Sequence, residues 1–167
     1  MATSRLKRLE TQIVAALRTV ERGYFQHVNL TSKSKAQARF YKRLVTALDW
    51  FRQSFGSHAN ESEAIVALAV AFETLLTDHY QQGVAERINR RVGICLKGFP
   101  GVTEYKQSVL EIYYARGSIV HTGELGQAAN VTKAQAAFAR CFCSIAARLA
   151  AWTPTSNDSM KNLLGDT

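Results

Sequence analysis

An arginine and a histidine, Arg116 and His121, lie five residues apart in the largely apolar run EIYYARGSIVHTGE. Arginine can hold a phosphate with two hydrogen bonds and stabilise negative charge as it develops. Histidine can donate or accept a proton near neutral pH, which suits a general acid or base. Together they are the minimum equipment for metal-free RNA cleavage, in which the ribose 2′-hydroxyl is the nucleophile.

The two side chains do not share one face of a regular helix. Five residues correspond to about 500°, which leaves the side chains about 140° apart and displaced by roughly 7.5 Å along the axis. Two arrangements could still bring them to one phosphate: a helix distorted near Gly117, or a two-fold dimer whose facing helices each contribute both residues. We expect the dimer, and the spacing alone does not decide between them.

An arrangement without catalysis uses the same residues. Glu73 could form a buried ion pair with Arg116. His121 could then serve only to stabilise the helix end before Gly123, because the negative end of the helix dipole favours an imidazolium. The sequence leaves this alternative open.

The segments that carry these residues are predicted to be helices. Apolar residues recur at spacings of three and four, and no segment shows the sustained alternation of a strand. Ser34 and Asn60 are suitable N-caps, and short connections favour a compact bundle. We predict helices at 3–22, 34–56, 61–78, 82–97, 103–121 and 131–152.

A chain of 167 residues has the length of one domain. We expect a basic N-terminal helix and linker over 1–33, the helical bundle over 34–152, and a flexible C-terminal tail over 153–167. Leu163 and Leu164 could dock that tail on the bundle.

Several functional classes lack their residues. The three cysteines have no CxxC spacing and the four histidines no paired spacing, so we expect no disulfide framework and no metal site. There is no glycine-rich phosphate loop or serine-hydrolase motif, and we expect no cofactor. The first ten residues show no secretory signal, and Arg140 and Arg148 interrupt the most apolar stretch. These features favour a cytoplasmic protein without a membrane span.

The net charge of +8 is concentrated at the N-terminal end. Residues 1–56 hold 11 Lys or Arg against 3 acidic residues, a balance of +8, whereas residues 57–130 hold 6 against 8 and residues 131–167 hold 4 against 2. This asymmetry fits a surface that meets RNA or an acidic protein partner. An ordinary solvated helix face is the equally weighted alternative.

Three segments together resemble the HEPN superfamily, and within it the Apea-like HEPN domains. They are AIVALAVAFETLLTD, AERINRRVGICL and VLEIYYARGSIVHTGE, in the order and approximate spacing of that family. The resemblance covers roughly residues 38–150. It implies an all-α, up-and-down bundle of the HEPN type, here with an additional N-terminal helix. It also implies a homodimer in which the Arg and His of two protomers line a cleft.

Many members of the superfamily are metal-independent endoribonucleases that act as toxins paired with antitoxins, in abortive infection or in other phage defence. By this resemblance His121 would perform acid/base catalysis and Arg116 would hold the scissile phosphate. Glu73 would orient Arg116 or pair with Arg91, for which a structural ion pair and an RNA contact are both open.

Further RNA contacts are expected from aromatic and basic side chains. Tyr113 and Tyr114 precede the motif and could stack on a base, or could instead pack in the core or a dimer interface. Lys and Arg of the first two helices, Lys42 and Arg43 among them, would contact the phosphate backbone.

Gly117 departs from the family pattern, because active members often carry a polar residue directly after the motif arginine. Here the next polar residue is Ser118, which lies about 100° further round the helix. Two non-catalytic functions therefore stay open. One is a HEPN module that binds RNA or nucleotide or scaffolds a partner; the other is a helical interaction protein that docks on an acidic partner such as an antitoxin.

Overall fold

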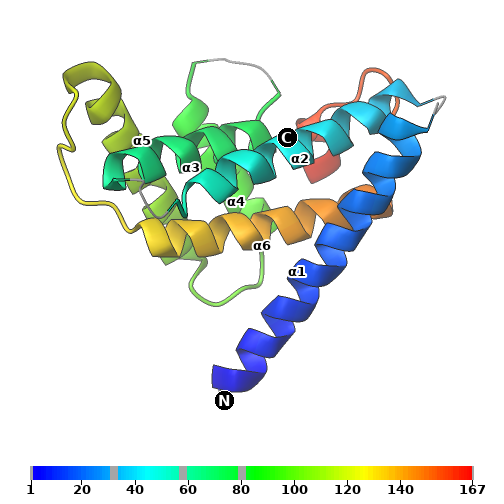
Figure 1. The fold of residues 1–167 in the computed structure, drawn as a ribbon, viewed down its shortest axis with the longest axis horizontal. Coiled ribbons are helices and arrows are strands. Elements are labelled where there is room, and N and C mark those ends of the chain that lie inside the picture. The colour runs from blue at the N-terminus through cyan, green and yellow to red at the C-terminus, as the bar shows by residue number, and fades with distance from the viewer. Residues whose placement is uncertain (1, 31–33, 57–59, 79–81, 167) are drawn as a thin grey trace.

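The computed structural model describes residues 2–30, 34–56, 60–78 and 82–166. These residues form an all-α bundle without strands, as expected from the sequence (Figure 1). The elements in chain order are α1 (Ala2–Tyr24), the π-helical turn η1 (Phe25–Asn29), α2 (Lys35–Gln53), α3 (Glu61–Leu76), α4 (Val84–Cys95), α5 (Val102–Thr122), α6 (Val131–Ala150) and α7 (Met160–Leu164).

Local signals position several helix ends where the sequence predicts them. The Ser34 side chain accepts a hydrogen bond from the Gln37 amide at 3.3 Å, and the Asn60 side chain accepts one from the Glu63 amide at 2.8 Å. Each bond satisfies a backbone donor that has no partner within its own helix. Gly123, at a φ of 76°, ends α5 in the left-handed conformation that glycine tolerates.

The core forms around α3 and α6. α6 contacts each of the other α-helices, and in Figure 1 it runs beneath α2 and α3. The ring of Phe138 on α6 stacks on Phe51 at a centroid distance of 4.3 Å and meets Phe72 on α3 edge-on at 5.5 Å. α3 is apolar almost all round and buried on most of its circumference, which is the pattern of a central helix. It therefore supplies a fixed surface for α5.

The buried side chains of α1 lie in its C-terminal half. Ala16 and Val20 are buried, and Gly23 lies so close to the ring of Tyr41 that an added Cβ would come within 2.1 Å of the ring. The N-terminal half of α1 extends beyond the bundle in Figure 1. None of the described helices combines the length and apolarity needed to span a membrane.

The chain's end is docked, which corrects the expectation of a flexible tail. Residues Met160, Leu163 and Leu164 of α7 are buried against the bundle, as the apolar pair at 163 and 164 allowed. Beyond them, Asp166 accepts hydrogen bonds from Arg90 Nε at 2.7 Å and from Arg91 Nε at 2.7 Å. A carboxylate 75 residues away in sequence thus satisfies the buried Arg91.

We predict that Asp166→Asn lowers the free energy of unfolding at pH 7 by about 2 kcal/mol, because the arginines lose a charged acceptor. The hydrogen bond from Arg90, with a further contribution from Arg91 and against the effect of burial, lowers the pKa of Asp166 from 3.8 to about 2. A lowered pKa stabilises the fold above the unfolded-state value of 3.8, and this stabilisation is lost as the pH falls toward 2. Denaturant unfolding between pH 7 and pH 2.5 should therefore show the difference from wild type shrinking below about pH 4.

Asp49→Asn is the matched control, because Asp49 is exposed on α2 and takes part in none of the ion pairs of the described residues. It should change stability little. A stability difference between wild type and Asp166→Asn that stays constant down to pH 2.5 would contradict the ion-pair account.

Candidate functional site

α5 is a continuous α-helix through the Arg116–His121 stretch. It runs from Val102 to Thr122 without a break at Gly117 and ends only at Gly123. The alternative of a distorted helix near Gly117 is therefore wrong. Within one chain, Arg116 and His121 remain on different faces, as the geometry of a regular helix requires.

Tyr113 of α5 lies within the electrostatic influence of both Glu73 of α3 and Arg116 of its own helix. Tyr113 is buried, and its hydroxyl donates a hydrogen bond to the Ala69 carbonyl at 3.1 Å. Burial, and next the Glu73 carboxylate, raise the pKa of Tyr113 well above 10, while the Arg116 guanidinium opposes this shift. The phenol therefore stays protonated, and the three side chains form one polar group between α3 and α5.

The Arg116 guanidinium has no acceptor within the described part of the chain. Its Nε is buried without a hydrogen-bond partner, and the ion pairs found there include none between Arg116 and Glu73. The buried Glu73–Arg116 pair of the non-catalytic alternative is thus not formed. Since an unpaired buried donor is costly, this site is suited to an anion that reaches it from outside.

His121 lies on the exposed side of α5, in its last turn. Tyr114 and Gly117 precede it by seven and four residues, so the three share one face. Tyr114 is 57% exposed, and a Cβ added at Gly117 would meet nothing within 4 Å. This face, with exposed Val120 at its edge, is defined here as the open face of α5.

Ser118 is oriented by the loop that follows α5. Its Oγ lies 2.9 Å from the position that a Cβ on Gly126 would occupy. The Ser118 side chain therefore faces Gly126 in the connection to α6.

Tyr113 and Arg43, two of the residues expected to contact RNA, are instead bonded within the chain, and Arg91, for which a structural ion pair and an RNA contact were both open, forms ion pairs. Tyr113 is 8% exposed and Arg91 is 3% exposed, so neither ring nor guanidinium is open to a nucleotide. Arg91 is ion-paired, but with Asp166 and Asp78 rather than with Glu73.

Arg43 is partly buried. Its guanidinium donates to the backbone carbonyls of Thr74 and, at 3.5 Å, of Glu73, at the C-terminal end of α3. Arg43 thus anchors the end of α3, where the Glu73 carbonyl also accepts a hydrogen bond from the Thr77 amide at 3.0 Å. Its pKa is lowered by burial, an effect that Asp78 opposes.

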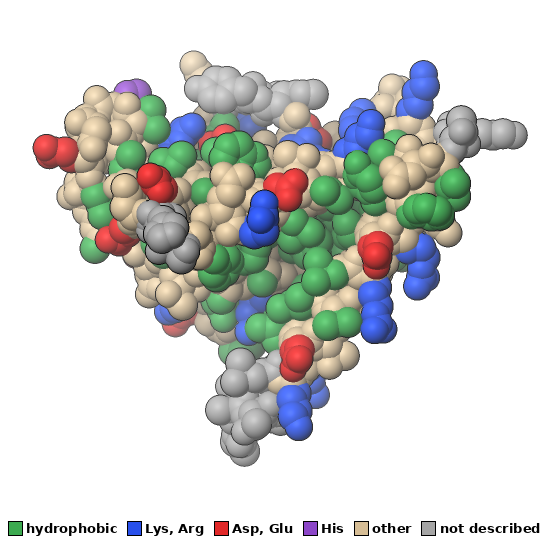
Figure 2. Space-filling model, viewed as in Figure 1, with side chains coloured by type: hydrophobic (Ala, Val, Ile, Leu, Met, Phe, Trp, Pro, Cys, Tyr) green, Lys and Arg blue, Asp and Glu red, His purple; other side chains and the backbone are tan. Residues whose placement is uncertain are grey.

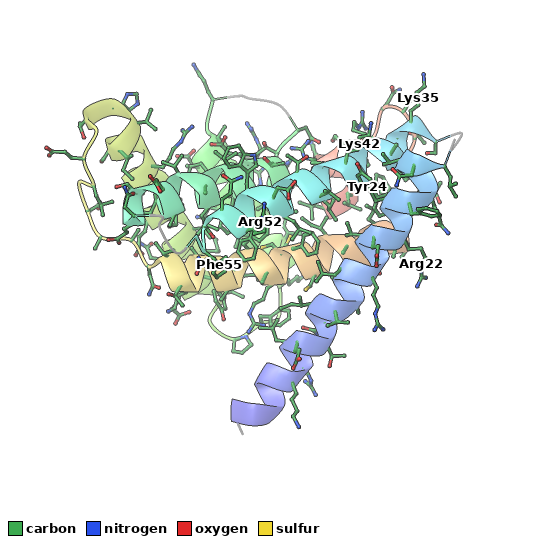
Figure 3. All side chains as sticks on the ribbon, viewed as in Figure 1. Arg22, Tyr24, Lys35, Lys42, Arg52 and Phe55 are labelled. Atoms are coloured by element: carbon green, nitrogen blue, oxygen red, sulfur yellow. The ribbon has the colours of Figure 1, made fainter. Side chains whose placement is uncertain are left out.

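Lys42 is exposed on α2, but it is far from the end of α5. Figure 3 shows Lys42, Lys35 and Arg22 at the corner where α1 meets α2, at the opposite end of the molecule from the C-terminal end of α5 in Figure 1. Figure 2 shows further Lys and Arg side chains along α1. In a single chain the basic corner and the Arg116–His121 stretch are therefore separate.

A cleft of about 740 Å³ opens between the C-terminal end of α2, the N-terminal end of α3 and α5. Ile119 is the one residue of α5 that lines it. It contains none of the residues expected to be catalytic. Within the described residues no three His, Cys, Asp or Glu side chains are grouped so that they could hold a metal ion.

Comparison with known proteins finds no significant match among protein-family models, curated proteins or solved structures.

Gly117→Ala should stabilise the isolated fold by about 0.5–1 kcal/mol, because alanine is the better helix former and the added methyl meets no atom of the described chain. Thermal or denaturant unfolding measures this directly. If a second chain or a ligand approaches the open face of α5 closely, the same substitution should weaken that contact while the monomer gains stability.

Gly126→Ala is the matched comparison. Its methyl would lie 2.9 Å from Ser118 Oγ and 3.3 Å from Ser118 Cβ, so we expect a loss of about 1 kcal/mol. A destabilised Gly117→Ala variant would show that position 117 is packed within the chain itself, contrary to the open face described above.

Proposed function

We propose that this chain is a metal-independent endoribonuclease of the HEPN type that acts on single-stranded RNA as a homodimer, in the cytoplasm. The observation that carries the proposal is the Arg116 guanidinium, whose buried Nε has no acceptor among the described residues and which lies on the helix whose last turn exposes His121. A phosphodiester would supply the missing acceptor. The resemblance to the HEPN superfamily supports a role as a toxin or phage-defence effector.

In the reaction, the ribose 2′-oxygen attacks the phosphorus, the bond from phosphorus to O5′ breaks, and a 2′,3′-cyclic phosphate remains. One proton leaves the 2′-hydroxyl and one is given to O5′. Arg116 would stabilise the charge on the phosphate oxygens. His121 would transfer a proton, and two protomers supply two imidazoles, one as base and one as acid.

The open face of α5 supports the dimer. A regular α5 keeps Arg116 and His121 apart within one chain, so a shared site needs a second copy of the helix. Gly117 lies on this face without a neighbour, and a glycine lets two backbones approach closely. Exposed Tyr114 and Val120 supply apolar surface beside it.

The second function is a non-catalytic HEPN module that binds RNA or scaffolds a partner. Two observations favour it: Gly117 takes the place of the polar residue found after the arginine in many active members, and the basic corner lies far from α5. In that case an acidic partner, for example an antitoxin, or RNA would bind at the corner of α1 and α2.

Purified wild-type protein in EDTA should cleave single-stranded RNA and leave 2′,3′-cyclic phosphate ends. His121→Ala should lower the rate at least about 100-fold, because proton transfer is lost. Thr103→Ala is the matched control, since Thr103 is exposed in the first turn of the same helix and should keep full activity. Circular dichroism verifies that each variant is folded.

Undiminished cleavage by His121→Ala would overturn the catalytic assignment. RNA binding that weakens with salt, without cleavage by wild type, would instead support the non-catalytic module. In that case Lys42→Gln should reduce the salt dependence and Thr103→Ala should not.

A further inference from the structure

A groove separate from the Arg116 site runs between α1, α6 and the loop that joins α4 to α5. It consists of two hollows of about 330 and 590 Å³ that share Gln12, Phe99 and Arg140. Figure 1 shows the N-terminal half of α1 and the α4–α5 loop both extending below α6. Each hollow has the size of a small-molecule site.

Arg140 lies over two aromatic rings in this groove. Its guanidinium carbon lies 5.2 Å from the ring centre of Phe99 and 5.5 Å from that of Tyr105. Cation–π contacts of this kind leave the N–H groups of the guanidinium plane available for hydrogen bonds.

No acceptor for these N–H groups is found in the described part of the chain. Arg140 Nε is buried without a hydrogen-bond partner, and Arg140 takes part in no ion pair there. By contrast, Arg148 on the next turns of α6 donates to the Leu164 carbonyl at 3.3 Å. An arginine that is positioned by two rings and lacks an acceptor is equipped to bind an anion.

The remaining lining residues indicate the rest of the ligand. Arg8 adds a second positive charge at the outer hollow, and neither hollow has an acidic residue among its described lining. The inner hollow is lined mainly by small side chains of α1 and α6: Ala15, Ala16, Thr19, Cys143, Ser144 and Ala147. A positive group beside a small-residue floor fits a molecule with one anionic group and an apolar body.

We propose that this groove binds a small organic anion whose carboxylate or phosphate is held by Arg140 and whose apolar body lies along the floor formed by α1 and α6. The proposal is independent of ribonuclease activity. Tyr105 lies in the first turn of α5, whereas Arg116 and His121 lie toward its other end.

Cys143 gives a direct report on the occupancy of the groove. It lines the inner hollow and is partly exposed, whereas Cys95 and Cys141 are buried. Burial raises the pKa of the Cys143 thiol, and the Arg140 guanidinium opposes this effect. A bound ligand should therefore slow the reaction of Cys143 with a thiol reagent.

The test uses three probes that share an alkyl chain of the same length and differ in the head group: decanoate, decyl phosphate and decanol. Isothermal titration calorimetry measures binding to the full chain, and the ratio of thiol-labelling rates with and without probe measures protection of Cys143. Decanoate, decyl phosphate or both should bind and protect Cys143, with an affinity at least about tenfold above that of decanol. The better of the two anions identifies the head group as carboxylate or phosphate.

Arg140→Gln should remove the preference for the anions over decanol. Arg18→Gln removes the same charge from an exposed position of α1 outside the groove and should leave the preference unchanged. If Arg140→Gln fails to fold, Arg140→Lys keeps the charge but loses the planar guanidinium, and should weaken anion binding about tenfold. The proposal is overturned if decanol binds as tightly as both anions, if no probe binds or protects Cys143, or if the Arg140 variant keeps the anion preference.

Discussion

The packing of this fold depends on hydrogen bonds from buried arginine side chains, because a buried guanidinium group needs acceptors. At the C-terminal end of α3, Arg43 and Arg91 donate to backbone carbonyls that have no partner within the helix, those of Thr74 and Leu76 among them. Arg91 also holds Asp166, which brings the end of the chain against α4. One cluster thus joins the C-terminal end of α3, the middle of α4 and Asp166.

Arg116 and Arg140 are the contrast. Each has a buried Nε without an acceptor in the described chain, although each is positioned by neighbours, Arg116 by the Tyr113 and Glu73 group and Arg140 by two rings. The cost of leaving such a donor unpaired is comparable to that of a lost hydrogen bond. A structural arginine avoids this cost, as Arg91 does, and this difference is the reason why we propose an external anion at Arg116 and at Arg140.

The sequence predicts local features of this molecule well and distant pairings poorly. Helices and N-caps depend on residues within a turn of each other, and Ser34 and Asn60 were identifiable for that reason. The partner of Arg91 was not, because Asp166 lies 75 residues away and nothing in its own neighbourhood marks it as an acceptor. α7 has five residues, too few for periodicity to distinguish it from a tail.

The same limit applies within the candidate site. Tyr113 and Tyr114 are adjacent and chemically alike, and only the packing of α3 makes one of them a buried donor and the other 57% exposed. Arg43 follows Lys42 directly, yet it turns toward the end of α3 while Lys42 stays in solvent. Such assignments depend on which face of a helix meets its neighbour, and the sequence pattern leaves that open when both candidates are polar or amphipathic.

The geometry of α5 connects the motif with the charge distribution. A two-fold pairing about the open face of α5 would place two His121 imidazoles near one axis and the two Arg116 guanidinium groups on the flanks of the paired helices, so that a site that uses both residues would draw them from the dimer. Because the basic corner of each protomer lies at the end remote from α5, the same pairing would put a basic corner at each outer end of the dimer. A single-stranded RNA that crosses the axis would then meet positive charge on both sides of the point of cleavage. In this arrangement the separation of motif and basic surface within one chain is compatible with their action on one RNA, since the dimer rather than the protomer would be the binding unit.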